Sequence, residues 1–215
     1  MTNDAVVHVV DDDLAVRRSL AFLLASDGLA VRLHESATAF LQAIGDPASG
    51  CVVTDVRMPD IDGLELLRRL KEAGPRLPVI VMTGHADVPM AVEAMRIGAF
   101  DFVEKPFDDE VLLKSIRTAL ARQNGGQGRD AELEKVRQLA AALSAREREV
   151  MDGLLKGKAN KVIAHELGLS PRTVEIYRAN VMTKMQAKSL SDLIRQALAL
   201  GTDHLEGTEG NRQNL

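Results

Sequence analysis

Residues 6–13 read Val-Val-His-Val-Val-Asp-Asp-Asp, a β-branched run that ends directly in three carboxylates. A short apolar run bounded by polar residues is typical of a buried strand. Similar runs occupy residues 30–33, 51–54, 79–82 and 100–103. Helical patterns lie between and after these runs, at residues 14–27, 37–44, 63–73, 88–97 and 108–122. This alternation predicts a parallel sheet with helices on both of its faces.

The chain after residue 122 has a different character. Residues 123–128 read Gln-Asn-Gly-Gly-Gln-Gly, a composition typical of a flexible linker. Beyond it the periodicity predicts only helices, at residues 133–143, 145–155, 161–167, 171–185 and 190–200. We therefore divide the chain into a first domain, a partly helical linker, an all-helical domain and a disordered tail, at residues 1–122, 123–138, 139–204 and 205–215.

Composition restricts the class of protein. Of the 215 residues, 46% are hydrophobic and 27% are charged, which is typical of globular domains. The single Cys51 excludes a disulfide framework and a cysteine zinc cage. The longest apolar run, residues 20–25, is far shorter than the roughly 18 residues that a membrane helix needs, and the acidic start resembles no signal peptide. We expect a soluble, cytoplasmic protein with no membrane partner.

Charge is distributed unevenly along the chain. Residues 1–122 carry 13 Lys and Arg against 19 Asp and Glu, a net charge of −6. Residues 139–200 carry 10 against 6, a net charge of +4. The asymmetry favours an acidic module joined to one that binds a polyanion, although ordinary surface variation is an equal alternative on charge alone.

Polar side chains follow the ends of four predicted strands. They are the acids 11–13, then Asp55, Thr83 and the run Glu104-Lys105-Pro106. Ligands of open parallel sheets bind beyond the carboxyl ends of the strands. Crowded carboxylates repel one another unless a cation such as Mg²⁺ neutralises them. An ionised Asp55 beside Mg²⁺ can attack an activated phosphoryl group, while Thr83 and Lys105 bind its oxygens. The alternative is that the first three acids merely cap the next helix.

These stretches resemble the receiver domains of two-component response regulators. The similarity lies in Val9-Val10-Asp11-Asp12-Asp13, Val53-Thr54-Asp55-Val56-Arg57-Met58-Pro59, Met82-Thr83-Gly84-His85 and Phe102-Val103-Glu104-Lys105-Pro106-Phe107. The resemblance implies a flavodoxin-like sheet of strand order 2-1-3-4-5 and a cis Lys105-Pro106 bond. It also implies that Asp55 is the phosphoacceptor, that Thr83 and Lys105 bind the phosphoryl group, and that Thr83 and Phe102 form a switch pair. The implied Mg²⁺ ligands are Asp11, Asp12, Asp55 and the Arg57 carbonyl.

The second domain contains a helix-turn-helix pattern. Residues 161–185 read as a helix, a short turn at residues 168–170 and a longer helix, which would enter the DNA major groove. Residues 143–150, 157–161 and 170–182 resemble the LuxR-type DNA-binding domain. Carried over by position, the resemblance implies two groups of contacts. Bases would be read by Glu175, Ile176, Arg178 and Ala179, and phosphates would be held by Asn160, Lys161, Thr173 and Lys184.

The order of the two domains and residues 83–95 are similar to the FixJ branch of response regulators. That branch implies a transcriptional activator, phosphorylated on Asp55 by a sensor histidine kinase, that forms a homodimer and binds double-stranded promoter DNA with RNA polymerase as a further partner. Its targets would be oxygen-regulated or nitrogen-fixation genes. The protein is then no enzyme beyond promoting its own phosphoryl transfer and dephosphorylation.

Two other functions remain open from the sequence. The first is a Mg²⁺-dependent phosphatase with a transient aspartyl phosphate on Asp55. Such enzymes usually place a second acid two residues after the nucleophile, where this chain has Arg57. The second is a constitutive DNA-binding protein with an inactive receiver, whose DNA affinity would depend on salt and not on phosphorylation.

Overall fold

A computed structural model describes residues 5–44, 49–74, 77–84, 88–123 and 129–206. The chain divides into two compact units. One comprises residues 1–86 and 97–126, and the other comprises residues 87–96 and 127–215. Both units are built from the elements that the sequence predicts, and we describe each by itself.

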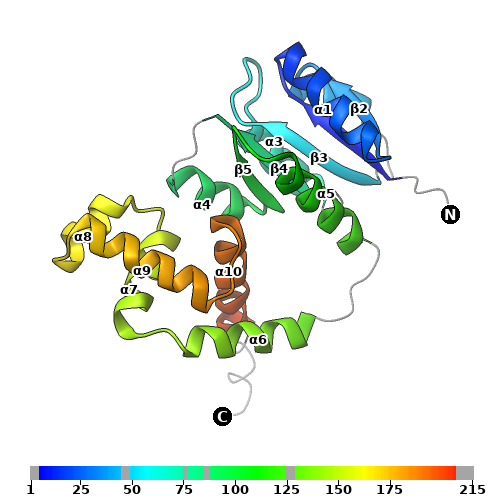
Figure 1. The fold of residues 1–215 in the computed structure, drawn as a ribbon. Coiled ribbons are helices and arrows are strands. Elements are labelled where there is room, and N and C mark those ends of the chain that lie inside the picture. Colours follow the sequence, from blue (N-terminus) through cyan, green and yellow to red (C-terminus); the bar gives the residue numbers. More distant parts are fainter. Residues whose placement is uncertain (1–4, 45–48, 75–76, 85–87, 124–128, 207–215) are drawn as a thin grey trace, which may run out of the picture. The chain divides into compact units, whose positions relative to one another are not determined.

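The first unit contains one parallel sheet (Figure 1). Its strands are β1 (Val6–Val10), β2 (Ala30–His34), β3 (Gly50–Asp55), β4 (Val79–Thr83) and β5 (Asp101–Glu104). They lie in the order β2-β1-β3-β4-β5, with Val6 beside both Ala30 and Gly50. The predicted flavodoxin-like order is confirmed, and the Lys105-Pro106 bond is cis.

Helices follow the strands as expected. Those of the first unit are α1 (Leu14–Ser26), α2 (Ala37–Ala43), α3 (Gly63–Glu72) and α5 (Asp109–Gln123). The helix after β4, α4 (Val88–Ile97), belongs to the second unit except for its last residue. Because side chains of a strand alternate between faces, Val7 and Val9 point to the same side of the sheet. There they pack with Leu24 of α1 and Ile116 of α5, all fully buried. This packing holds the strand ends, and so the acidic side chains that follow them, on a rigid base.

A pair of histidines lies on the opposite face of the sheet. Nδ1 of His8 lies 3.1 Å from Nε2 of His34, and Phe40 packs edge-on against both rings. Burial, with smaller contributions from His34 and Arg32, lowers the pKa of His8 to about 4. Burial also lowers the pKa of His34. Both imidazoles are therefore neutral in the folded protein near pH 7.

This pair predicts a loss of stability in mild acid. His8 has a pKa of about 4 in the folded protein against an ordinary value of 6.5, so between those values the unfolded chain binds the extra proton. Stability is fully present above pH 6.5 and falls as the pH drops towards 4. The free energy of unfolding, measured in urea, should be lower at pH 5 than at pH 7.5 by on the order of 2 kcal/mol because of this group. The H8Q variant should lose that difference, the exposed-site control H165Q should keep it, and an unchanged pH dependence in H8Q would contradict the prediction.

The second unit contains a helical core built from α6 (Arg129–Ala141), α7 (Ala145–Leu155), α8 (Asn160–Leu167), α9 (Pro171–Lys184) and α10 (Leu190–Glu206). Val150 and Leu154 of α7 pack with Val174 and Val181 of α9, all fully buried. The helix starts agree with the sequence. Ser144 and Glu147 form a capping box, and Ser170 caps α9 ahead of Pro171 at the first helical position.

Two helices extend several residues beyond their predicted bounds. The α6 helix begins at Arg129 and not at residue 133, and α10 continues to Glu206 and does not end at residue 200. The predicted disordered tail, from residue 205, lies almost entirely outside the described residues. Leu200 still packs against the core of the unit, and no proline follows it to stop the helix. Among the described residues, no helix is both long enough and apolar enough to span a bilayer.

Candidate phosphoryl and DNA-binding sites

The parallel strands bring the predicted polar residues of the first unit to one edge of the sheet. Asp55 is the last residue of β3 and Thr83 is the last residue of β4. Asp11 follows β1 directly, and Lys105 follows β5. Asp11, Asp55 and Thr83 are buried, with residue exposures of 1%, 8% and 1%. We call this group of residues, together with Asp12, the acidic rim.

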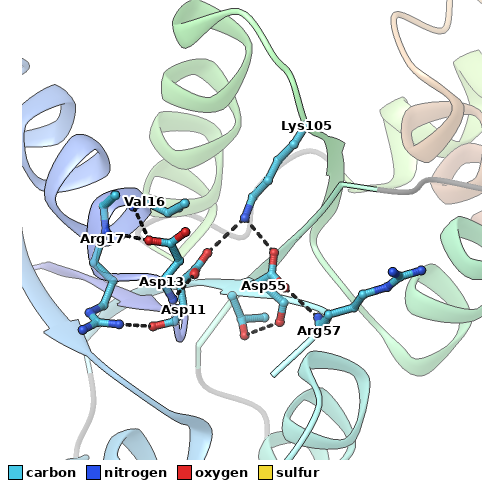
Figure 2. Close-up of polar contacts among 9 residues, drawn as sticks. Asp11, Asp13, Val16, Arg17, Asp55, Arg57 and Lys105 are labelled. Atoms are coloured by element: carbon cyan, nitrogen blue, oxygen red, sulfur yellow. Dashed lines mark hydrogen bonds and ion pairs between the residues drawn. The ribbon is translucent and has the colours of Figure 1, made fainter. Parts of the chain in front are cut away.

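Lys105 joins the two buried acids of the rim. Its Nζ lies 2.7 Å from Oδ1 of Asp55 and 3.0 Å from Oδ2 of Asp11 (Figure 2). Burial opposes the charge on Lys105, but hydrogen bonds to both acids outweigh it, so the pKa of the ammonium is raised. Burial raises the pKa of Asp11, against the lowering effect of Lys105. The rim thus places one cation between two carboxylates that would otherwise repel each other.

The backbone around Asp55 holds its carboxylate in place. The N–H of Arg57 donates to Oδ2 of Asp55 at 2.6 Å, while Oδ1 takes the bond from Lys105 (Figure 2). Gly63 begins α3 directly against this strand end, and a Cβ there would overlap the carbonyl of Asp55. Glycine is therefore required at position 63, which explains why the loop after Asp55 ends in Asp62-Gly63.

The remaining predicted residues of the first unit differ in their surroundings. Asp12 is exposed at the rim. Asp13 caps α1, its Oδ1 accepting from the N–H of Ala15 at 2.7 Å, so the capping alternative is correct for this acid. Phe102 is half-buried on β5. Among the described residues, no group of three or more His, Cys, Asp or Glu side chains is arranged to hold a metal ion by itself.

The structure adds two groups that the sequence analysis missed. Arg17 is buried and its Nη1 donates to the carbonyl of Asp11 at 2.6 Å (Figure 2). Asp60, in the loop after Asp55, accepts from the N–H of Thr38 at the start of α2 at 3.0 Å. Arg17 has a signal in the sequence, because its spacing from the buried Leu20 and Leu24 places it on the apolar face of α1. Asp60 has none, since its partner lies 22 residues away.

The second unit contains the predicted helix-turn-helix. Gly168 ends α8 in the left-handed conformation, with φ of 65°, and Ser170 starts α9. On α9 the buried Val174 and Val181 face the core, which leaves the other side of the helix to solvent. That side carries three of the predicted base-reading residues, the exposed Glu175, Ile176 and Ala179, and Arg178 is half-buried beside them.

The predicted phosphate-binding residues are in less uniform positions. Lys161 is exposed on α8, whereas Asn160 and Thr173 are half-buried. Lys184, at the end of α9, donates to the buried carboxylate of Glu147 at 2.7 Å. This bond and the bond from the Ser144 N–H lower the pKa of Glu147 to about 2. Lys184 therefore already has a structural partner that ties α9 to α7.

Both units match known families. Residues 7–117 match the response regulator receiver domain, and residues 141–197 match the LuxR family of bacterial regulatory proteins. The chain therefore belongs to the two-component response regulators that join a receiver domain to a LuxR-type DNA-binding domain. A receiver domain implies a sensor histidine kinase as its partner, and a LuxR-type domain implies DNA binding.

Similar proteins narrow this class to the FixJ type. The chain is 57% identical over 202 residues to the transcriptional regulatory protein FixJ of Azorhizobium caulinodans, covering 94% of this chain and 95% of that protein. It is 43% identical to the response regulator protein TmoT of Ectopseudomonas mendocina, covering 89% and 87%. The crystal structure of full-length FixJ from B. japonicum is 51% identical, covers 94% of this chain and 99% of that chain, and has a TM-score of 0.55. This is a family of transcriptional regulators.

Proposed function

We propose that Asp55 accepts a phosphoryl group from a sensor histidine kinase, and that the phosphorylated protein forms a homodimer that binds promoter DNA and activates transcription with RNA polymerase. The observation that carries the proposal is the Lys105 ammonium held between Asp55 and Asp11. The receiver would comprise residues 1–122, the linker 123–138 and the DNA-binding domain 139–204. Resemblance to the FixJ branch favours oxygen-regulated or nitrogen-fixation genes as targets.

Each residue of the rim has a separate part in the transfer. A carboxylate oxygen of Asp55 attacks phosphorus, so that an O–P bond forms as the N–P bond to the kinase histidine breaks. The Arg57 N–H keeps the Asp55 carboxylate in one orientation. Lys105, which bonds Oδ1 of Asp55 at 2.7 Å, can shift that bond to a phosphoryl oxygen. Thr83, at the end of β4, would bind a second phosphoryl oxygen. Its movement would change the conformation of Phe102, the other residue of the switch pair.

The rim also has the chemistry that Mg²⁺ requires. Asp11 is a buried acid whose pKa is raised by burial, so a nearby cation would stabilise its charged form. Asp11, exposed Asp12, Asp55 and the Arg57 carbonyl supply oxygen atoms, the ligands that hard divalent ions prefer. Two or three carboxylates are enough, because Mg²⁺ usually keeps waters and substrate phosphate as its other ligands. When bound, Mg²⁺ neutralises charge on the transferring phosphoryl oxygens.

The α9 helix would read promoter DNA in the second unit. The R178A variant should weaken binding to a specific operator by about 1–3 kcal/mol while leaving non-specific binding nearly unchanged, because Arg contacts base edges bidentately. Binding would be measured by fluorescence anisotropy on an operator selected from random duplexes, with R137A on α6 as control. An R178A protein that selects the same operator with wild-type affinity would remove Arg178 from the base-reading residues.

The proposed function as a whole is tested with the full chain. The protein would be incubated with Mg²⁺ and acetyl phosphate, and intact mass, oligomeric state and DNA binding would be measured on the same sample. We expect one phosphoryl group, dimer formation and binding to paired half-sites roughly 10 bp apart. Phosphorylation without a change in oligomeric state or DNA affinity would contradict the proposal and favour a constitutive DNA-binding protein.

A further inference from the structure

Every polar group of Asp11 contacts a partner in the protein. Its N–H donates to the carbonyl of His34 at 3.3 Å, and its own carbonyl accepts from Arg17 at 2.6 Å. Oδ1 accepts from the N–H of Asp13 at 2.9 Å, and Oδ2 contacts Lys105 at 3.0 Å. At 1% exposure Asp11 is closed to bulk water, so each of these groups needs a protein partner. Three segments, the end of β2, the start of α1 and the residues after β5, thus determine where one acid of the rim lies.

Arg17 is the unexpected member of this set. It sits on the buried face of α1 with Leu20 and Leu24, at 9% exposure, whereas its neighbour Arg18 is exposed. Burying a guanidinium costs free energy unless it is hydrogen-bonded. Among the described residues, the hydrogen-bond partner of the Arg17 side chain is the Asp11 carbonyl and not a carboxylate (Figure 2). The buried guanidinium is therefore bonded to the backbone of a rim residue.

We propose that Arg17 is a positioning residue for Mg²⁺ binding. By holding the Asp11 carbonyl it would keep the loop of Asp11 and Asp12 in the conformation that presents their carboxylates to the ion. This inference rests on the proposed function, since it requires Mg²⁺ at the acidic rim. Removing a group that hydrogen-bonds to a metal ligand typically weakens metal binding by about 10–100-fold.

Charge and geometry make opposite predictions for this residue. A fixed positive charge near the rim repels a divalent cation, so if charge dominates, its removal strengthens Mg²⁺ binding. If positioning dominates, removal weakens binding because the Asp11 carbonyl loses its partner and the loop gains freedom. The sign of the effect therefore distinguishes the two.

The experiment measures Mg²⁺ affinity directly. The full chain is titrated with MgCl₂ by isothermal titration calorimetry, with no phosphodonor present. The R17M variant keeps an apolar stem in the buried site and removes the donors, so we expect about 10-fold weaker binding. R17K keeps a charged donor and should recover most of the affinity. R18M, at the exposed neighbour, should bind as the wild type does.

The outcomes distinguish a failure of the positioning role from a failure of the proposed function. Wild-type protein that takes up no Mg²⁺ would contradict the proposed function itself. If folded R17M binds Mg²⁺ as tightly as the wild type or more tightly, only the positioning role is overturned. The same holds if R17K binds Mg²⁺ as weakly as R17M. Thermal unfolding checks the fold of each variant. R17M that fails to fold while R17K folds would also overturn the proposal, because Arg17 would then support the fold and not the metal ligands.

Discussion

The D55N variant should take up no phosphoryl group from acetyl phosphate in the presence of Mg²⁺. The amide is isosteric with the carboxylate but carries no negative charge and is a poor nucleophile. Asp55 is only 8% exposed, and its two oxygens accept separate bonds from Lys105 and the Arg57 N–H, so an amide of the same shape keeps one of these bonds and turns its NH₂ group towards the other donor. Phosphorylation, the dimer and phosphorylation-dependent DNA binding should be lost together.

The matched control for this variant is E104Q. Glu104 ends β5 at the same edge of the sheet and is exposed, so the change removes one carboxylate charge without touching the contacts of Asp55. E104Q should be phosphorylated like the wild type, as measured by intact mass against time. A D55N protein that still gains a phosphoryl group would move the acceptor to another acid of the rim, Asp11 or Asp12.

The K105M variant should be phosphorylated about 100-fold more slowly than the wild type. Loss of a donor aimed at developing negative charge typically costs about 10²–10³ in rate. The variant also leaves Asp11 and Asp55 without the cation that lies 3.0 Å and 2.7 Å from them. Their mutual repulsion is then no longer offset by a cation. Methionine keeps the apolar stem of lysine, so the fold should tolerate the change.

The rate would be followed at saturating Mg²⁺ and several concentrations of acetyl phosphate. K114M, at an exposed lysine of α5, is the control and should react at the wild-type rate. K105R separates charge from geometry, because arginine keeps the charge but not the point-like ammonium, and it should be slow as well. Wild-type kinetics in K105M would show that the bridge to Asp11 and Asp55 serves only stability.

Patterns of neighbouring residues predicted most of the helices and strands. The β-branched run before Asp11 begins and ends where β1 does, and the capping box at Ser144 and Glu147 starts α7 as expected. These features depend on a few neighbouring residues, which is why a sequence pattern detects them. The end of α10 was not predicted, because Gly201 and the mostly polar residues 202–206 carry no apolar period for a pattern to detect.

The candidate site was predictable in its residues but not in its contacts. Four strand ends with polar residues define one rim once the sheet is known to be parallel, and resemblance to receiver domains assigns their roles. The partners of those residues could not be predicted. The bond from Lys105 to Asp11 spans 94 residues, and the bond from Lys184 to Glu147 spans 37.

The sequence by itself determined the class of this protein: two domains, an acidic rim on a parallel sheet and a helix-turn-helix with an exposed reading face. Those properties follow from the period of apolar residues and from residue types at strand and helix ends, which act locally. Only the tertiary structure decided that Arg17 bonds the carbonyl of Asp11, that His8 and His34 share a hydrogen bond, and that Lys184 is paired with Glu147. Each is a pairing of polar groups within a buried environment, and such pairings depend on which distant segments packing brings together.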